Sequence, residues 1–126
     1  MLSIDRQSQT PIYEQIVSQA ETLIETGYFA SDEPLPSVRT LSKELAINPN
    51  TIQKAYSELE RRKLCYTVPG SGRFISSEAA QIIRESRRQH LPEFRRLARM
   101  MKQAGVSLEE LLEIVKTAYE GGNDHD

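Results

Sequence analysis

Residues 48–61 read NPNTIQKAYSELER, and they predict a helix with two chemically different faces. Asn48 followed by Pro49 is typical of a helix start, because Asn caps free N–H groups and proline fits the first helical position. The apolar side chains recur at helical spacing and form one stripe, made of Ile52, Ala55, Tyr56 and Leu59. The opposite face is polar and consists of Asn50, Gln53, Lys54, Ser57 and Arg61. We therefore expect one face to be buried and the other exposed.

Two further helices are expected before this one. Thr10-Pro11 predicts the start of the first, with threonine as the cap and proline at the first helical position, and Gly27 ends it. Residues 31–36 contain two prolines and are not expected to be helical. Ser37 then caps a short helix with apolar positions Val38, Leu41 and Leu45, and Ala46-Ile47 makes a tight connection to the next helix. A short helix, a tight turn and a second helix form a helix-turn-helix.

After Leu64 the hydrophobic period changes from helical to two, which predicts strands at 65–68 and 73–76. Residues 69–72, Pro-Gly-Ser-Gly, supply the turn of a hairpin between them. The order helix, helix, helix, hairpin predicts a winged helix-turn-helix over residues 1–76. The expected fold class is mainly α with a small β-hairpin, followed by a helical dimerisation appendage over residues 77–126.

The appendage is expected to contain two long helical stretches. The first runs from Glu78 to about Gln103 and is expected to break near His90-Leu91, because Pro92 cannot donate the helical hydrogen bond. Residues 107–110 form a capping box that opens the last helix. The residues expected to form the dimerisation surface share an apolar face: Leu91, Phe94, Leu97, Ala98, Met101, Leu108, Leu111, Leu112 and Val115.

An amphipathic helix must bury its apolar stripe, and the winged helix is small, so we expect a second copy to cover it. The alternative is that the appendage folds back on its own winged helix. About 50 residues of helix are too few to enclose a metabolite in the manner of a larger effector domain.

The composition and charge of the sequence argue against a membrane protein and a secreted protein. In 126 residues there is no run of about 18 apolar residues that would span a membrane, and the N-terminus lacks the features of a signal peptide. We therefore expect a cytoplasmic protein. The net charge is −2, but residues 35–75 carry +4 whereas residues 1–34 carry −5. A basic segment between less basic flanks indicates a local site for a polyanion.

The exposed face of the third helix carries side chains of the types that contact DNA bases and phosphates. Asn50 and Gln53 each offer a donor and an acceptor, which match the N6/N7 edge of adenine, and Lys54 can reach a phosphate or a guanine. Gly70 and Gly72 make the hairpin tip small enough to approach a minor groove. The full set of expected DNA contacts is Arg39, Asn48, Asn50, Thr51, Gln53, Lys54, Ser57, Gly70, Ser71, Gly72 and Arg73, with Asn48 equally explained as a cap alone.

No catalytic or metal-binding constellation is expected. His90 and His125 are far apart in the sequence, the terminal Asp-His-Asp would chelate a metal weakly, and Cys65 is the only cysteine. Cys65 is more readily explained as a core residue than as a redox sensor. We therefore expect no cofactor and no enzymatic activity.

Three stretches together resemble the GntR family of regulators: LPSVRTLSKEL at 35–45, NPNTIQKAYSELE at 48–60 and GSGRFI at 70–75. PIYEQI at 11–16 also matches, and the Asn-Pro-Asn-Thr variant with a short tail resembles the YtrA subfamily. The resemblance implies a repressor that dimerises through its C-terminal helices on a palindromic operator, and a neighbouring transporter operon as its target. It also implies DNA contacts at Arg39, Asn48, Asn50, Thr51, Gln53 and Gly70.

The sequence departs from that family at two points. Pro49 and Gln53 stand where many relatives have a cation, which indicates a different base preference. Ser31-Asp32-Glu33 replaces the usual Pro-Gly-Asp before the second helix. The alternative function is a protein-interaction module built on the same fold, against which the basic segment and the polar helix face argue.

Overall fold

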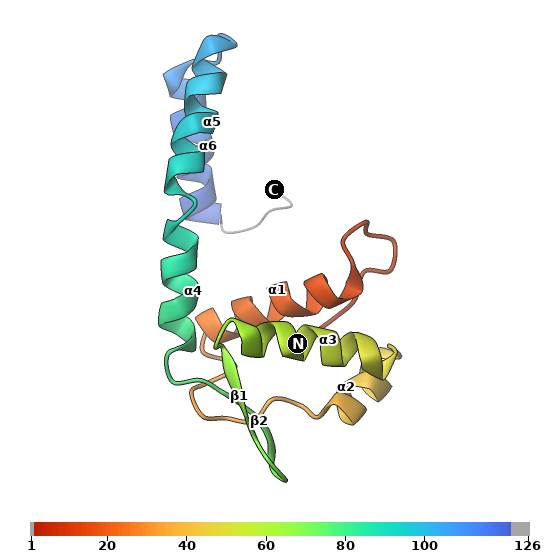
Figure 1. The fold of residues 1–126 in the computed structure, drawn as a ribbon. Coiled ribbons are helices and arrows are strands. Elements are labelled where there is room, and N and C mark those ends of the chain that lie inside the picture. Colours follow the sequence, from red (N-terminus) through yellow and green to blue (C-terminus); the bar gives the residue numbers. More distant parts are fainter. Residues whose placement is uncertain (1, 122–126) are drawn as a thin grey trace. The chain divides into compact units, whose positions relative to one another are not determined.

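The computed structural model describes residues 2–121 and contains, over that range, helices and one β-hairpin (Figure 1). The elements are α1 (Ile12–Glu25), α2 (Val38–Leu45), α3 (Pro49–Arg61), β1 (Cys65–Val68), β2 (Gly72–Ile75), α4 (Ala79–Arg88), α5 (Leu91–Gln103) and α6 (Leu108–Gly121). They form two compact units, Met1–Ser86 and Arg87–Asp126. The predicted fold class, mainly α with a small hairpin and C-terminal helices, is confirmed.

The first unit is built around α3. Helix α1 runs alongside α3, and α2 packs against its beginning (Figure 1). The predicted apolar stripe of α3 is buried, including Tyr56, which is 2% exposed. The other buried apolar side chains are Ile16, Val17, Ala20, Ile24, Leu35, Leu41, Ile47, Leu64, Cys65, Ile75, Ala79 and Ile83. Cys65 is thus a core residue, and burial raises the pKa of its thiol to about 11.

Two of the three predicted helix caps in this unit form. The Asn48 side chain accepts a hydrogen bond from the Asn50 N–H at 2.8 Å, and Ser37 Oγ accepts one from the Thr40 N–H at 3.0 Å. The prediction for α1 is wrong by one residue, because Pro11 itself occupies the cap position and no side chain caps the helix.

Thr10 is used elsewhere. Its carbonyl accepts a hydrogen bond from Gln15 Nε2 at 2.9 Å, and its N–H donates to Ser8 Oγ at 3.1 Å. The Gln15 side chain also bonds both backbone groups of Asp5. These contacts fold residues 5–10 against α1 and take Thr10 away from the cap.

The turn between α2 and α3 is left-handed at Ala46, where φ is 55°. The N–H of Ile47 donates to the Ser42 carbonyl at 3.1 Å, which closes α2. Arg6 reaches this turn from the N-terminal segment, and its Nη2 donates to the carbonyls of Leu45 and Ala46, each at 3.0 Å. The N-terminal segment therefore helps to fix the turn that sets the direction of α3 relative to α2.

The hairpin pairs Cys65 with Ile75 and Val68 with Gly72 in antiparallel register. The second strand begins at Gly72, one residue before the prediction, because Gly72 belongs to the ladder and not to the turn. At the tip, Gly70 adopts a positive φ of 81°, which favours glycine.

Residues 32–35 add a partner to the free edge of β2 that the sequence did not indicate. The N–H of Asp32 donates to the Ile75 carbonyl at 2.8 Å, and that of Leu35 donates to the Arg73 carbonyl at 2.9 Å. Pro34 forms a β-bridge opposite Phe74. The segment therefore ties the start of α2 to the base of the wing.

The break predicted near residue 90 is present, since α4 ends at Arg88 and α5 begins at Leu91. The first part of α4 belongs to the winged helix, because Ala79 and Ile83 are buried in its core. In the second unit, Ser107 Oγ accepts a hydrogen bond from the Glu110 N–H at 3.1 Å and so caps α6. Neither α5 nor α6 contains a buried residue.

We expect Ala46→Gly to stabilise the protein by about 0.5–1 kcal/mol, since a Cβ is disfavoured at the positive φ of this turn. Chemical denaturation of the variant and the parent protein measures the difference. Ala104→Gly is the matched control, because Ala104 ends α5 with φ of −83° and gains nothing from glycine. Equal effects of the two substitutions would contradict the argument.

Candidate nucleic-acid interface

The polar face of α3 is free for an external partner. Asn50, Gln53, Lys54 and Ser57 are exposed, and Thr51 beside them is half-buried. Within residues 2–121, the side-chain amides of Asn50 and Gln53 make no intramolecular hydrogen bond. Their donors and acceptors are therefore available, and the burial of the opposite face fixes the direction in which they point.

Lys54 lies toward α1, at one side of this face. Its Nζ is 4.0 Å from the centroid of the Tyr13 ring, a cation–π contact with α1. The Tyr13 hydroxyl donates to Glu14 at 3.2 Å, and this hydrogen bond and the charge of Glu14 raise the pKa of Tyr13. The predicted DNA contacts did not include Tyr13, although PIYEQI places it in the first turn of the first helix.

The wing tip is exposed at Gly70, Ser71 and Gly72, as its glycines predicted. Arg73 differs, because its side chain is only 19% exposed and its Nε lies 3.3 Å from Glu60 Oε1. Thr67 Oγ1 also donates to that oxygen, at 2.8 Å. Glu60, a residue outside the predicted site, thus fastens both strands of the wing to the end of α3.

A cleft of about 260 Å³ separates the wing from the start of α2. The wing side is lined by 67–70 with Gly72 and Arg73, and the helix side by 36–38. Tyr56 closes the bottom, where its hydroxyl donates to the Pro36 carbonyl at 2.7 Å and burial raises its pKa. Arg39 is exposed on α2, one residue beyond the segment that lines the cleft.

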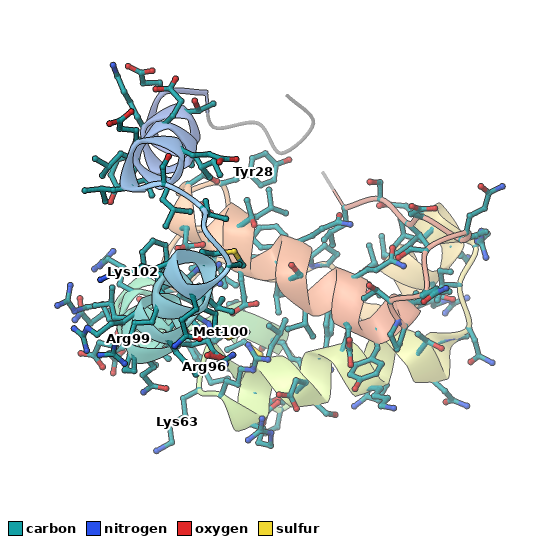
Figure 2. All side chains as sticks on the ribbon, turned by 90° about the horizontal axis from the view of Figure 1, so that it is seen from above. Tyr28, Lys63, Arg96, Arg99, Met100 and Lys102 are labelled. Carbon is teal, nitrogen blue, oxygen red and sulfur yellow. The ribbon has the colours of Figure 1, made fainter. Side chains whose placement is uncertain are left out.

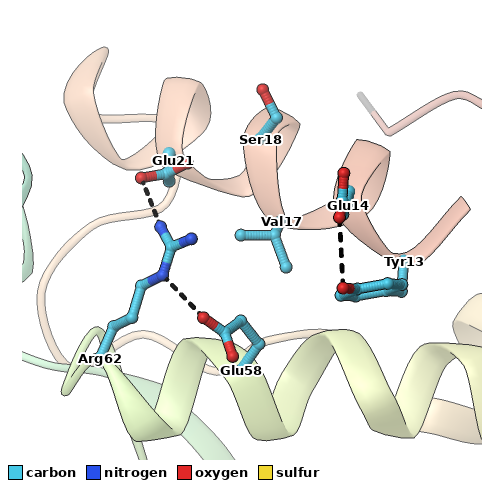
Figure 3. A pocket seen from close by; sticks show the side chains of 7 residues that line it. All are labelled: Tyr13, Glu14, Val17, Ser18, Glu21, Glu58 and Arg62. Atoms are coloured by element: carbon cyan, nitrogen blue, oxygen red, sulfur yellow. Dashed lines mark hydrogen bonds and ion pairs between the residues drawn. The ribbon is translucent and has the colours of Figure 1, made fainter. Parts of the chain in front are cut away.

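Ion pairs fix α3 on α1 beside a pocket of about 370 Å³ (Figure 3). Arg62 lies 3.0 Å from a carboxylate oxygen of Glu21 on α1 and 3.0 Å from one of Glu58 on α3. Arg61 also contacts Glu58, at 2.6 Å. Hydrogen bonds from the two guanidinium groups lower the pKa of Glu58 to about 2.

The second unit presents an apolar groove of about 290 Å³ between α5 and α6. Its lining residues are Phe94, Leu97, Ala98, Met101, Leu108, Leu111, Leu112, Ile114 and Val115. Of the predicted dimerisation residues only Leu91 is outside this lining, and Ile114 is an addition. Phe94 is 59% exposed and Leu112 is 56% exposed, so the groove is open in the single chain.

A wing, a helix-turn-helix and an outward polar helix face define a winged-helix DNA-binding protein. The family model "Bacterial regulatory proteins, gntR family" matches residues 12–75. The chain belongs to the GntR family of DNA-binding transcriptional regulators, which are not enzymes, and the resemblance found in its sequence is confirmed.

Relatives cover both units of the chain. It is 39% identical over 130 residues to the HTH-type transcriptional repressor YtrA of Bacillus subtilis (strain 168), with 100% of each chain covered. A GntR-family transcriptional regulator from Listeria monocytogenes superposes with a TM-score of 0.73 at 34% identity, covering 90% of this chain and 98% of that one. The DNA-binding domain of AraR in complex with operator ORX1 superposes with a TM-score of 0.53 at 27% identity, covering 60% and 93%.

Across residues 2–121, no three side chains of the metal-ligating types come together. The terminal Asp-His-Asp of the sequence lies outside the described residues. Over the same range, none of the helices combines the length and the apolar character needed to cross a membrane.

We expect the stability conferred by Glu58 to depend on pH. The carboxyl pKa is about 2 in the folded protein against a usual value of 4.5, so the stabilisation is present above about pH 4.5 and is lost as pH falls toward 2. Glu58→Gln should lower the free energy of unfolding by up to about 1 kcal/mol at pH 7 and by less at pH 3.

Denaturant titrations at a series of pH values test this expectation. Glu44→Gln is the control, since Glu44 is an exposed carboxylate on α2 that forms no ion pair within residues 2–121. A Glu58→Gln effect that stays constant from pH 7 to pH 3 would show that the carboxylate charge is not what stabilises the packing of α3 on α1.

Proposed function

We propose that the chain binds a palindromic operator as a homodimer and acts as a repressor in the cytoplasm. The observation that carries this proposal is the outward face of α3, where unpaired amides are presented by a helix whose other face is buried. A helix of this size fits the major groove of B-DNA, which is about 12 Å wide.

The proposed contacts divide by chemistry. Asn50 and Gln53 read base edges, and Ser57 extends the same surface by one turn. The exposed cations Arg39 and Lys54 contact phosphates or a nearby base. At the positive end of the α3 dipole, the Asn48 N–H and the Thr51 hydroxyl bind a phosphate, since the N–H groups of Asn50 and Thr51 already donate to Asn48.

The wing supplies the remaining contacts. Gly70, Ser71 and Gly72 approach the minor groove, where the absence of large side chains permits close contact. Arg73 binds the DNA backbone through its two Nη groups, since only its Nε is engaged by Glu60. Glu60 holds the wing and α3 in one fixed arrangement and so positions both for the same DNA segment.

The dimer is proposed to form through the apolar groove between α5 and α6, whose residues Phe94 and Leu112 are exposed in the single chain. Two recognition helices related by a two-fold axis read half-sites about 34 Å apart, which matches a palindrome. The similarity to the repressor YtrA over the full chain supports repression as the outcome of binding. By the same resemblance, we propose a neighbouring transporter operon as the target.

Selection of duplexes from a random pool tests the proposal, because it yields the site, its symmetry and the half-site spacing together. Recovery of a palindrome with half-sites one helical turn apart supports it. If random duplex competes as well as the selected duplex, sequence-specific recognition is refuted. If no duplex binds, the alternative of a protein-interaction module gains support.

We expect Gln53→Ala to change base preference and Lys54→Ala to weaken binding to all sequences. Loss of an amide that reads one base pair costs about 1–3 kcal/mol on the preferred site and little on a site altered at that pair. Loss of a phosphate contact lowers affinity uniformly and reduces the salt dependence. Fluorescence anisotropy on matched duplexes distinguishes the two, with Gln81→Ala on α4 as the control.

We expect Leu112→Asp to produce a folded monomer, because Leu112 is exposed in the single chain and lies in the groove. Sedimentation analysis measures the mass, and titration with whole and half operators measures binding. The variant should lose high affinity for the whole site and keep weak affinity for one half-site. Thr117→Asp, on the same helix but outside the groove, should remain a dimer; a dimeric Leu112→Asp protein would contradict the proposed interface.

A further inference from the structure

The two helices that border the apolar groove carry opposite charge. Helix α5 contains four cations and one acid, a net charge of +3, whereas α6 contains one cation and four acids, a net charge of −3. Charges at the helix ends favour helix formation, but a net charge of one sign along a whole helix is not needed for it. The segregation of charge therefore points to a partner that presents the complementary pattern.

The charges on α5 lie in a stripe along the groove. Arg95, Arg99 and Lys102 recur at spacings of four and three residues and so share one side of the helix, next to the apolar stripe. Figure 2 labels Arg99 and Lys102, which both come from α5. All three residues are exposed, and within residues 2–121 none of them forms an ion pair.

The acids on α6 are arranged in the same way. Glu109, Glu113 and Glu120 recur at spacings of four and seven residues, are exposed, and form no ion pair within the described part of the chain. On both α5 and α6, when the helix is viewed from its first residue, the charged stripe lies on the same side of the apolar stripe. Flanks of this kind face each other when two helices pack antiparallel, as in coiled coils.

The basic stripe does not meet the acidic stripe within one chain. The groove of about 290 Å³ lies between α5 and α6, and the structure has no ion pair that joins the two helices across residues 91–121. Arg96, on another side of α5, pairs instead with Glu93 of its own helix. The complementary charges are thus available to a second copy.

We propose that the two copies pair crosswise, with α5 of one chain against α6 of its partner, and that the Arg95/Arg99/Lys102 and Glu109/Glu113/Glu120 stripes specify this pairing. The inference rests on the proposed dimer and adds its arrangement and its specificity. In crosswise pairing, a basic stripe faces an acidic stripe at each of the two symmetry-related contacts. Packing α5 against α5, or α6 against α6, would place like charges side by side. The occupant of the groove is therefore a second copy of this chain.

Neutralising the basic stripe changes the dimer dissociation constant in opposite directions in the two arrangements. In crosswise pairing, Arg95→Gln with Arg99→Gln removes attractive contacts and should raise the dimer dissociation constant roughly tenfold at low salt. Pairing of α5 with α5 would give the opposite result, a tighter dimer, because the substitutions relieve repulsion. The effect should shrink between about 50 and 300 mM salt as the charges are screened.

The control is Lys43→Gln with Lys63→Gln, which makes the same change in net charge in the winged-helix unit and should leave the dissociation constant unchanged. Sedimentation equilibrium of the full chain provides all the constants. A monomeric parent protein would refute the dimer itself, whereas a dimer that the Arg95/Arg99 substitutions leave unchanged or tighten would refute only crosswise pairing.

A mixing experiment separates pairing between chains from attraction within one chain. The variant Arg95→Glu/Arg99→Glu makes both helices acidic, and Glu113→Lys/Glu120→Lys makes both basic, so each alone should dimerise poorly. Glu109 is left unchanged, because its charge also favours the start of α6.

When the two variants are mixed, the crosswise arrangement should restore dimers that contain one chain of each kind. Native mass spectrometry identifies these heterodimers, since one variant can carry a tag of different mass. Recovery of the heterodimer supports the proposal. Failure of the mixture to dimerise would show that the charges act only within a chain and would overturn it.

Discussion

The organisation of this protein depends on the burial of one stripe of α3. Ile52, Ala55, Tyr56 and Leu59 are taken from water by α1 and α2, and burial of such side chains stabilises by about 1.5–3 kcal/mol each for the larger ones. Because a helix is rigid, fixing that stripe also fixes the direction of Asn50 and Gln53 on the opposite face. The packing of the core therefore sets the direction of the face that we propose contacts DNA.

Polar contacts around α3 further fix its position relative to the neighbouring elements. Arg62 joins α3 to α1, Glu60 joins it to the wing, and the Tyr56 hydroxyl joins it to the segment before α2. Arg6 holds the turn through two carbonyls. The wing and the start of α2 are in this way tied to α3, so the three elements that we propose approach DNA present their surfaces as a unit.

The second unit differs from the first, because most of its apolar side chains remain exposed in the single chain. No residue of α5 or α6 is fully buried within the single chain, and the two helices leave an open groove bordered by charge. Apolar side chains favour association without defining which surfaces meet, whereas exposed charges contribute less energy and discriminate between arrangements. A dimer built on such a unit can set the spacing of two reading helices, which is the quantity that a palindromic operator requires.

The sequence by itself determined the order of the elements, the caps at Ser37 and Asn48, the break before Pro92 and the division of α3 into two faces. These features depend on residues within a few positions of one another, so local spacing and capping chemistry are sufficient to predict them. Only the tertiary structure decided that Gln15 takes Thr10 from its cap, that Glu60 engages Arg73, that Lys54 lies on Tyr13 and that residues 32–35 pair with β2. The first spans only five residues, but it depends on which way the Gln15 side chain turns, and helical spacing does not specify that. The other three join segments whose proximity results from packing of the whole unit, and no periodicity along the chain records which distant side chains that packing brings together.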